Sequence, residues 1–420
     1  MEALLRRIIP KAIVDRLRPG YHFSLALLGA VFYRFPAQKL VVVGITGTKG
    51  KTSTAELLNS ILEAAGAKTA LLGTLRFKIG KNSERNLKKM TMPGRFFVQK
   101  FLHDAQKAGC THAVIEMTSE GARQFRQRFI DMDALIFTNL SPEHIESHGS
   151  FEKYREAKLS IARTLARSSK TKRFMIANAD DAAGKAFLDI AGVIATPFSI
   201  SDAAALAATE SGISLSWRKY SVNSQLPGTF NAYNILGAAT CAEALGIPLA
   251  AIIKGIERLT SIEGRMERVE GGQPFPVIVD YAHTPDSLEA VYSAYASHEN
   301  ICVLGNTGGG RDKWKRPIMG KIADDHCAHV ILTDEDPYDE DPRSILLAIA
   351  EGMKRKKPEI ILNRREAIRR AITLAGGLKN PAVLITGKGT DPYIMGANGS
   401  KTPWDDRTVT REELEKLFHS

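Results

Sequence analysis

The segment 40–53, LVVVGITGTKGKTS, decides the fold of this 420-residue chain. It starts with a continuous apolar run and continues through a glycine-rich turn. Beyond the turn, apolar residues recur at spacings of three and four, at Ala55, Leu58, Ile61, Leu62 and Ala65. A buried strand, a loop and an amphipathic helix are therefore predicted in that order, with Gly66 ending the helix.

The loop in this segment is typical of a phosphate-binding site. Backbone N–H groups at the start of the helix can surround phosphate oxygens, Lys51 can neutralise β/γ charge, and the Thr52 hydroxyl can reach Mg²⁺. The pattern departs from the common GxxxxGK[ST] form because Ile45 stands at its first glycine. A purely structural turn is the alternative, but Gly-Lys-Thr between a strand and a helix favours a nucleoside triphosphate. The ATP-binding residues expected here are Gly47, Thr48, Gly50, Lys51, Thr52 and Ser53.

Short, continuous apolar runs recur along the rest of the chain, separated by lengths that suit crossover helices. They occur at 40–44, 113–117, 134–138, 174–177, 277–281, 301–305, 329–333 and 382–386. Such runs indicate parallel strands covered on both faces. The fold class predicted is α/β, with a mostly parallel central domain of the phosphate-loop ATPase type and a Rossmann-like C-terminal domain.

The predicted organisation has three parts: a basic and apolar segment at 1–39, a central domain at 40–262 and a C-terminal domain at 263–420. The first part contains a mostly apolar stretch at 21–33, YHFSLALLGAVFY, which is shorter than the roughly 18 residues that span a bilayer. It also lacks the features of a signal peptide. We expect a helix that is buried in the core or, as the alternative, lies at an anionic membrane surface.

The charge of the chain is concentrated at its front. The formal net charge is +11, and residues 1–107 contain 19 basic and 6 acidic residues, whereas the remainder contains 38 and 40. No nucleic-acid-binding motif accompanies the charge, so nucleic acid is not expected as a partner. The four cysteines lie far apart without CxxC spacing, which predicts neither a disulfide framework nor a zinc site and favours the cytoplasm.

Two further polar groups follow predicted strands. Glu116 ends the run at 113–117, where a carboxylate faces the ligand-binding edge of an α/β sheet, although a helix cap or a surface acid is the alternative. His144 follows the run at 134–138 and, taken alone, is more often an ordinary loop histidine.

Residues 40–415 resemble the Mur ligase family, ATP-dependent amide-forming enzymes of peptidoglycan precursor synthesis. The matching stretches are TGTKGKTS, NLSPEHIESHG with EAK downstream, FNAYN, GRMERV, DYAHTPDSL, GGGRDKWKRPIMG and GKGTDPY. Their order is most similar to the MurE branch, the UDP-N-acetylmuramoyl-tripeptide synthetases. Members usually carry a complete N-terminal domain that grips UDP, and only 39 residues precede the phosphate-loop strand here.

The resemblance implies ATP and Mg²⁺ as cofactors. It places Thr52, Glu116, His144 and Lys158 at the metals, with Lys158 carbamylated, and makes Lys51, Glu116, His144 and Lys158 the catalytic set. An ordinary surface lysine is the alternative for Lys158. Further nucleotide contacts are implied for Asn231, Asn234, Arg265, Asp280, Tyr281 and His283.

The implied reaction is the addition of a diamino acid to UDP-N-acetylmuramoyl-L-alanyl-D-glutamate through an acyl phosphate. The substrate-binding residues implied are Thr91, Ser119, Gln124, Arg126, Arg311, Asp336, Tyr338, Gly387 and Asp391. Diaminopimelate-adding members read DNPR where Asp336 and Tyr338 replace the Asn and Arg. Without that arginine, a bidentate contact with the distal carboxylate of diaminopimelate is lost, which favours lysine or ornithine as the acceptor. The alternative is that another arginine, such as Arg311 or Arg343, binds this carboxylate.

Two other functions stay open at this point. One is a related ligase acting on a lipid-linked or γ-glutamyl substrate, and the other is a catalytically silent nucleotide-binding scaffold. The intact Lys51, Glu116, His144 and Lys158 argue against the scaffold.

Overall fold

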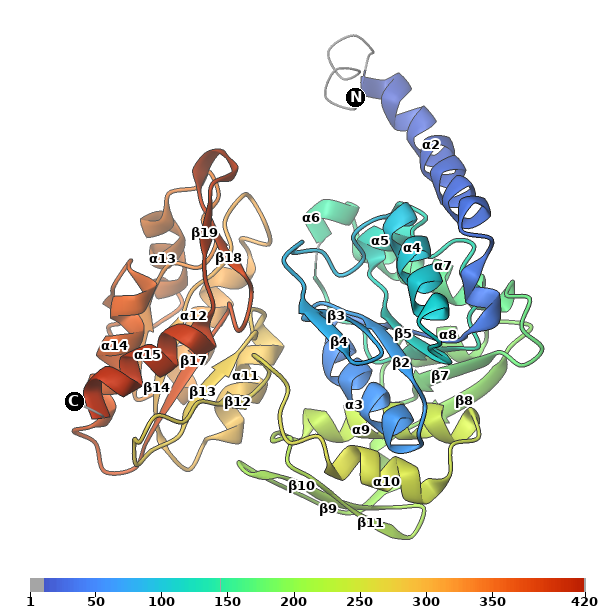
Figure 1. Cartoon of the computed structure of the whole chain (residues 1–420). Coiled ribbons are helices and arrows are strands. Elements are labelled where there is room, and N and C mark those ends of the chain that lie inside the picture. Colours follow the sequence, from blue (N-terminus) through green and yellow to red (C-terminus); the bar gives the residue numbers. More distant parts are fainter. Residues whose placement is uncertain (1–10, 144, 419–420) are drawn as a thin grey trace. The chain divides into compact units, whose positions relative to one another are not determined.

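The computed structural model describes residues 11–143 and 145–418, with side chains from residue 17 onward. It divides into two compact units (Figure 1). Unit 1 comprises the chain up to residue 142, 148–203 and 233–258, and unit 2 comprises 143–147, 204–232 and the chain from 259 onward. The domain boundaries predicted above remain a prediction.

Unit 1 is built on one eight-stranded sheet in the order β4-β3-β2-β5-β1-β6-β7-β8. The six strands from β2 to β8 in this order are parallel, and β3 and β4 add an antiparallel edge. The strands are β1 (Val41–Thr46), β2 (Thr69–Leu72), β3 (Arg76–Ile79), β4 (Asn82–Arg85), β5 (His112–Glu116), β6 (Ala134–Phe137), β7 (Phe174–Asn178) and β8 (Ile194–Phe198).

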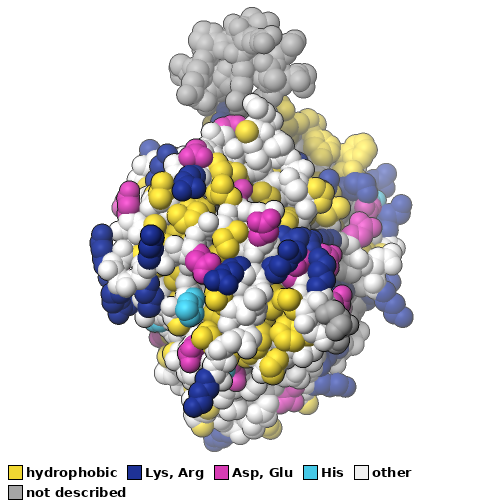
Figure 2. Space-filling view, turned by 90° about the vertical axis from the view of Figure 1, so that its left-hand side faces the viewer, with side chains coloured by type: hydrophobic (Ala, Val, Ile, Leu, Met, Phe, Trp, Pro, Cys, Tyr) yellow, Lys and Arg dark blue, Asp and Glu magenta, His cyan; other side chains and the backbone are white. Residues whose placement is uncertain are grey.

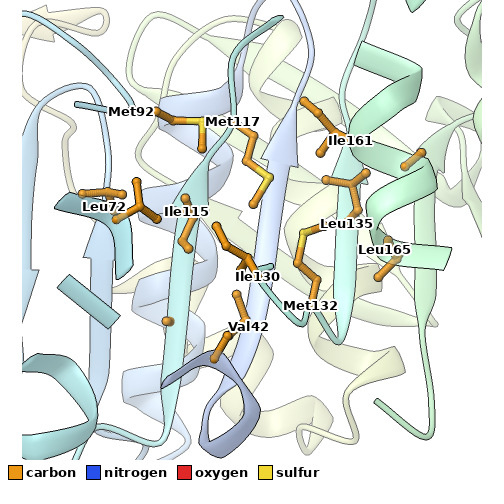
Figure 3. Close-up of a cluster of buried hydrophobic side chains, with 14 of the residues drawn as sticks. Val42, Leu72, Met92, Ile115, Met117, Ile130, Met132, Leu135, Ile161 and Leu165 are labelled. Atoms are coloured by element: carbon orange, nitrogen blue, oxygen red, sulfur yellow. The ribbon is translucent and has the colours of Figure 1, made fainter. Parts of the chain in front are cut away.

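Helices cover both faces of this sheet. The helices of unit 1 are α2 (Lys11–Phe32), α3 (Lys51–Ala64), α4 (Arg95–Lys107), α5 (Ser119–Arg123), α7 (Phe151–Ala166), α8 (Gly184–Leu188) and α10 (Leu249–Glu257), with the 3₁₀ turns η1 (Pro36–Lys39) and η2 (Ile200–Asp202). Of these, α2 packs on α4 and α10 packs on α3 rather than on the sheet. The face toward α4 and α7 holds a core of side chains including Val42, Ile115, Met117, Leu135 and Ile161 (Figure 3). Continuous burial along the strands explains their unbroken apolar runs.

Two helices, α6 (Ile145–His148) and α9 (Phe230–Ala244), lie where the chain passes between the units. Gly237 of α9 approaches Ile136, whose neighbours Leu135 and Phe137 belong to the core on the α4 face. Successive strand residues point to opposite faces, so α9 covers the other face of the sheet. The buried α3 lies on that face too, because Thr54 bonds to Asn234 of α9.

Unit 2 contains a six-stranded sheet in the order β12-β13-β17-β14-β15-β16, parallel except for β12. Its strands are β12 (Glu267–Arg268), β13 (Val277–Asp280), β14 (Glu299–Leu304), β15 (His329–Leu332), β16 (Glu359–Ile360) and β17 (Pro381–Thr386). A three-stranded sheet, β9 (Ala203–Thr209), β10 (Gly212–Trp217) and β11 (Tyr220–Ser224), and a ribbon, β18 (Tyr393–Met395) and β19 (Lys401–Pro403), complete its strands.

The six-stranded sheet also has a core on each face. Residues of α11 (Pro285–Ala294), α12 (Lys315–His326) and α13 (Pro342–Ala350) form one, and residues of α14 (Arg364–Ala375) and α15 (Asp406–Phe418) form the other. A 3₁₀ turn, η3 (Ala397–Gly399), joins β18 to β19. The predicted class, α/β with a mostly parallel central sheet and a parallel C-terminal sheet, is confirmed.

All eight predicted strands occur within a residue or two of the apolar runs, and the predicted helix after the phosphate loop is α3. The strands that were not predicted are β2 and β8 of the central sheet, its β3–β4 edge, the short β12 and β16, the β18–β19 ribbon and the sheet formed by β9, β10 and β11. The strands β4 and β9 are largely exposed, and β9 is alanine-rich, so no buried run marks them. In β10, by contrast, Ile213, Leu215 and Trp217 alternate with serines, and this alternation was an available signal for a half-buried strand.

The cysteine prediction was wrong for one pair, because Cys302 and Cys327 form a disulfide. Cys302 lies in β14 and Cys327 follows α12, which runs back along the sheet. This crossover brings the two Cα atoms to 6.0 Å although 25 residues separate them. Sequence spacing alone carries no signal for such a pair, and the cytoplasmic prediction loses that support.

The N-terminal helix α2 is longer than the predicted 21–33 stretch and continues through Pro19. Ala26 and Ala30 are buried, whereas Leu28 and Phe32 are 57% and 72% exposed, so the core-helix interpretation holds for one face only. Among the described residues, no helix is long and apolar enough to cross a membrane.

A buried ion pair ties α14 and α15 to the strand ends of unit 2. The guanidinium of Arg364 donates to both carboxylate oxygens of Asp406, at 2.8 and 2.7 Å, and also to the carbonyl of Thr386 at the end of β17. Both side chains of the pair are at most 1% exposed. A further bond reaches the carbonyl of Asp334 after β15.

We predict that Arg364→Leu lowers the free energy of unfolding by about 3–5 kcal/mol, because it leaves the buried carboxylate of Asp406 without its charged partner. The matched control is Arg370→Gln, which breaks an ion pair with Glu359 whose side chains are 44% exposed, and should change stability by less than about 0.5 kcal/mol. Urea unfolding followed by circular dichroism measures both. Equal, small effects would show that the buried pair does not hold these elements together.

Candidate active site

The phosphate loop joins the end of β1 to the start of α3 in a tight turn. Gly47 and Gly50 have φ of 148° and 79°, values that side chains rarely adopt. A Cβ added at Gly47 would lie 1.9 Å from Thr138 Oγ1, and one at Gly50 would lie 2.3 Å from Asn234 Oδ1. Only glycine fits at these two positions, so the backbone amides of the loop stay unobstructed by side chains.

Lys51 is the first residue of α3 and folds back over the loop. Its Nζ donates to the carbonyls of Gly47 and Thr48 at 2.9 and 2.8 Å. The Thr48 hydroxyl lies 3.0 Å from the Tyr154 hydroxyl of α7. The cation is thus held where the loop and the N-terminus of a helix favour a polyphosphate.

Glu116 ends β5 beside the phosphate loop and is 1% exposed. Its Oε2 accepts hydrogen bonds from the hydroxyls of Thr52, at 3.0 Å, and Thr74, at 2.8 Å. Its Oε1 accepts from the Thr74 backbone N–H at 2.7 Å. The alternatives of a helix cap or a surface acid therefore do not describe Glu116, which is a buried acceptor at the strand edge.

Thr74 is a site residue that the sequence analysis missed. Its single hydroxyl proton goes to Glu116, so Thr91 Oγ1, at 3.0 Å, donates to Thr74 Oγ1. Thr91, which the resemblance assigns to the substrate, is therefore connected to Glu116 through the hydroxyl of Thr74. Thr74 lies two residues beyond β2, a strand that was not predicted, so no pattern in the sequence pointed to it.

The residues near the loop fit a hard divalent cation bound together with a nucleotide. Thr52 and Glu116 bring a hydroxyl and a carboxylate oxygen within 3.0 Å of each other. In the described part of the chain, no three His, Cys, Asp or Glu side chains cluster as a metal site of their own. Mg²⁺ in phosphoryl-transfer sites is typically held by one or two protein oxygens, with phosphates and water completing its shell. His144, the other predicted ligand, lies outside the described residues.

Lys158 of α7 is buried, with 2% exposure, next to the phosphate loop. Its Nζ donates to the carbonyl of Gly47 at 2.7 Å and lies 4.7 Å from the centre of the Tyr154 ring. The surface-lysine alternative is therefore excluded. A lysine nitrogen is held at the same carbonyl that accepts from Lys51.

Gln124 and Arg126 belong to one hydrogen-bonded network beside α5, whereas the side chain of Ser119 has a different partner. Arg126 Nη2 donates to Gln124 Oε1 at 2.8 Å, and its Nη1 donates to the carbonyl of Met92 in the loop that contains Thr91. Burial lowers the pKa of Arg126. Ser119 Oγ lies 3.1 Å from His148 Nε2. The structure thus brings Thr91, Gln124 and Arg126 together.

The predicted nucleotide residues Asn231 and Asn234 lie one turn apart near the start of α9, and both are buried. Asn231 donates to the carbonyl of Pro227 at 2.7 Å, and Asn234 accepts from the Thr54 hydroxyl at 3.2 Å. Asn234 also faces Gly50, as described above, so α9 and the phosphate loop touch. Ser53 is buried within α3.

In unit 2, the remaining predicted nucleotide residues gather where β13 ends. Asp280 is buried, which raises its pKa, and it accepts from the backbone N–H groups of Met266 and Ala282. The guanidinium of Arg265 lies 4.5 Å from the centre of the Tyr281 ring. His283 Nδ1 lies 2.7 Å from the Tyr281 carbonyl.

A second buried cluster of unit 2 contains most of the predicted acceptor residues. Lys388 is 1% exposed, and its Nζ donates to Asp336 at 2.9 Å and Asp391 at 3.0 Å. The guanidinium of Arg311 lies 5.0 Å from the centre of the Tyr338 ring. The sequence analysis missed Lys388, whose ammonium already pairs with the two acids proposed to meet the acceptor.

Glu335 is the other residue that was missed. It is 3% exposed, and its Oε1 accepts from Thr307, whereas within the described part of the chain its Oε2 has no hydrogen-bond partner. A Cβ added at Gly387, where φ is 108°, would lie 2.4 Å from that oxygen. Its position directly before Asp336 in the sequence was the signal that could have identified Glu335 as a site residue.

The other acids of the 334–341 run have structural roles. Asp341 caps the N-terminus of α13, and Asp339 accepts from the backbone N–H of Asn398. The hydrogen-bonded Arg316 guanidinium lowers the pKa of Glu340 to about 2. This run is therefore not a uniformly open acidic surface, and its buried acids are Glu335 and Asp336.

Comparison with known proteins identifies the family. The Mur ligase middle domain matches residues 45–242, and the Mur ligase glutamate ligase domain matches residues 264–389. A UDP-N-acetylmuramyl-tripeptide synthetase of Roseiflexus sp. (strain RS-1) is 37% identical over 427 residues, covering 95% of this chain and 83% of that protein. A UDP-N-acetylmuramoyl-L-alanyl-D-glutamate–2,6-diaminopimelate ligase of Bacillus cereus (strain ATCC 14579) is 35% identical, covering 93% and 81%.

Solved structures agree on the fold. One of a UDP-N-acetylmuramoyl-L-alanyl-D-glutamate–2,6-diaminopimelate ligase has a TM-score of 0.62 and 29% identity, covering 91% of this chain and 79% of that chain. A Mycobacterium tuberculosis folylpolyglutamate synthase complexed with ADP has a TM-score of 0.71 over 94% of both chains, but at 17% identity it shows the fold alone. From the two domain matches and the identities with its relatives, the chain belongs to the Mur ligase family and is MurE-like.

Proposed function

We propose that this protein is an ATP-dependent ligase that adds a diamino acid to UDP-N-acetylmuramoyl-L-alanyl-D-glutamate in peptidoglycan precursor synthesis. The observation that carries the proposal is the contact between Thr52 and Glu116 at the phosphate loop, in a chain whose relatives bear this function in their names. Because its substrates are nucleotides, we propose that it works in the cytoplasm.

The proposed reaction has two steps. A carboxylate oxygen of the donor attacks the γ-phosphorus of ATP, ADP leaves, and an acyl phosphate forms. The acceptor amine then attacks the acyl carbon and releases inorganic phosphate. Mg²⁺, when bound with ATP, neutralises charge on the phosphate oxygens.

The chain's own residues have distinct tasks in this proposal. Lys51 lies at the loop and stabilises the charge that develops on the transferring phosphoryl group. Thr52 and Glu116 supply the oxygens for the metal. Thr91, Ser119, Gln124 and Arg126 bind the donor, and residues at the end of β13 bind the nucleotide.

We propose that Lys158 is carbamylated and that His144 serves a second metal. The neutral amine of Lys158 attacks CO₂ and loses a proton, which converts a cation into a carboxylate-like oxygen ligand. A carbamate nitrogen keeps one N–H, so the bond to the Gly47 carbonyl can persist after the modification. The burial of Lys158 beside the phosphate loop supports this assignment, because a carbamate formed there would place its oxygens next to the expected metal and phosphates.

We predict that Lys51→Ala and Glu116→Gln each lower donor-dependent phosphate release by about 100-fold or more while the fold persists. The exposed residues Lys81 and Glu84 provide matched controls as Lys81→Ala and Glu84→Gln. The assay supplies ATP, Mg²⁺, the UDP-linked donor and L-lysine, omitting each in turn. Release that needs no amine, or near-normal turnover in either site variant, would contradict the proposal.

For Lys158, we predict that Lys158→Ala loses activity and that short carboxylates such as acetate partly restore it. A free carboxylate can replace the carbamate as an oxygen ligand. Lys153→Ala on the exposed side of α7 is the control and should not respond to acetate. An unimpaired Lys158→Ala enzyme would refute carbamate ligation.

The acceptor is proposed to present a side-chain ammonium to the buried cluster of unit 2. Glu335, Asp336 and Asp391 carry three negative charges, and Lys388 brings one positive charge. The guanidinium of Arg364 also attracts Glu335 but is paired with Asp406, so the cluster can accept a further cation. The free oxygen of Glu335 is the best-placed acceptor atom for it. L-lysine or L-ornithine brings only an ammonium, whereas diaminopimelate adds a carboxylate.

Arg311 provides the competing arrangement. Its guanidinium over Tyr338 could pair with the distal carboxylate of meso-diaminopimelate, the amino acid named for several relatives. We keep the preference for L-lysine or L-ornithine, because Arg311 is exposed and the buried acids outnumber Lys388.

We predict a higher kcat/KM for L-lysine or L-ornithine than for meso-diaminopimelate in direct competition. Glu335→Gln should lower kcat/KM for L-lysine about tenfold or more, since it removes a charged partner, whereas Glu351→Gln on the exposed end of α13 should not. Asp336→Asn with Tyr338→Arg should shift the ratio toward diaminopimelate. A wild-type preference for diaminopimelate that Arg311→Ala abolishes would assign the site to a carboxylate instead.

A further inference from the structure

The helix α2 presents an apolar face that no other described part of unit 1 covers. Its exposed large side chains include Leu17, Tyr21, Leu28, Val31 and Phe32, which are between 49% and 72% exposed. At 100° per residue these five positions fall within one third of the helix circumference, so they form a stripe rather than a scatter. Single exposed apolar residues need no explanation, but a contiguous stripe does.

From residue 22 onward, the opposite side of α2 is fixed to unit 1. Ala26 and Ala30 are buried, and a Cβ added at Gly29 would lie 3.5 Å from the Cα of Phe96 in α4. Phe23 packs edge-on against Phe125 and Phe129, at ring distances of 6.1 and 5.3 Å. The half of the stripe from Leu28 to Phe32 is therefore attached to the unit that contains the phosphate loop, and Leu17 and Tyr21 extend it along a turn of α2 that is exposed on all sides. Phe96, itself 40% exposed, adds to the apolar surface.

The charges around the stripe are almost all positive. The sequence contains no Asp or Glu from residue 16 to residue 55, while Arg18, Arg34 and Lys39 lie exposed near the two ends of the stripe. On the adjacent α4, the acid Asp104 is neutralised by Lys100. On α5, Arg123 pairs with Glu120. The surface thus combines an apolar stripe with unbalanced basic groups.

We propose that the exposed face of α2 docks in the plane of an anionic lipid bilayer. The stripe from Leu17 to Phe32 is about 24 Å long at 1.5 Å per residue, and no described helix is apolar enough to span a bilayer. A helix with one apolar face and flanking arginines binds by inserting that face among the acyl chains while the cations meet lipid phosphates. Figure 2 shows hydrophobic side chains gathered at the distant upper right of that view.

A second copy of this chain is the competing occupant of the stripe. Two such faces would bring arginines of both copies together without acidic partners, which opposes association, whereas an anionic surface is complementary to them. The inference does not depend on the proposed ligase activity, because it concerns a face built from residues outside the phosphate loop and the donor network.

The test is co-sedimentation of the full chain with vesicles of phosphatidylcholine, with and without a quarter of phosphatidylglycerol. We expect binding that needs phosphatidylglycerol and weakens when salt is raised from about 0.1 to about 0.5 M. The triple variant Leu17→Gln, Leu28→Gln, Phe32→Gln should lower the vesicle partition about tenfold or more. Its matched control replaces exposed hydrophobics elsewhere, as Ile194→Gln, Tyr220→Gln, Leu362→Gln, and should bind as the wild type does.

A variant that removes basic side chains separates the electrostatic contribution to vesicle binding from the contribution of the apolar stripe. Arg18→Gln, Arg34→Gln, Lys39→Gln should lose the dependence on phosphatidylglycerol, whereas Lys219→Gln, Lys379→Gln, Arg411→Gln should retain it. Circular dichroism and sedimentation velocity on the same samples verify folding and oligomeric state. Absence of vesicle binding, equal binding by the stripe variant, or a dimer that the stripe variant abolishes would each overturn the proposal.

Discussion

The hydrogen bonds accepted by Glu116 are the constraint on which the rest of unit 1 depends. One carboxylate, ending β5, holds the first turn of α3 through Thr52 and the end of β2 through Thr74. A buried carboxylate without these donors would be strongly unfavourable, so the strand ends and the phosphate loop must converge on it. The convergence places a hydroxyl, a carboxylate and a lysine at one edge of a parallel sheet, which is where such folds bind ligands.

In unit 2, ion pairs rather than neutral donors hold the buried carboxylates near the strand ends. Arg364 joins Asp406 to the carbonyl of Asp334, which follows β15, and to that of Thr386, which ends β17. Next to these strand ends, Lys388 holds Asp336 and Asp391 together. Lys388 thereby fixes Asp336 and Asp391 in position. The proposed specificity for a diamino acid depends on the negative charge of the cluster that Lys388 does not neutralise.

The sheets could be predicted from the sequence because their strands are buried on both faces, so that runs such as 40–44 and 382–386 are continuously apolar. Lys51 and Thr52 could be predicted because their roles are set by local spacing. Thr74 and Lys388 could not, because their roles depend on which strand ends become neighbours after folding. The same holds for the pairing of Cys302 with Cys327 across a crossover.

The central claim is that a donor carboxylate becomes an acyl phosphate at the phosphate loop. Donor enriched in ¹⁸O at its glutamyl carboxylates tests this directly, because the oxygen that attacks phosphorus leaves with the phosphate when the amine adds. Mass spectrometry of the released phosphate should find one labelled oxygen per turnover when ATP, donor and L-lysine are all present. Unlabelled phosphate released at the same rate would show that water, not the donor, attacks ATP, and would contradict the account.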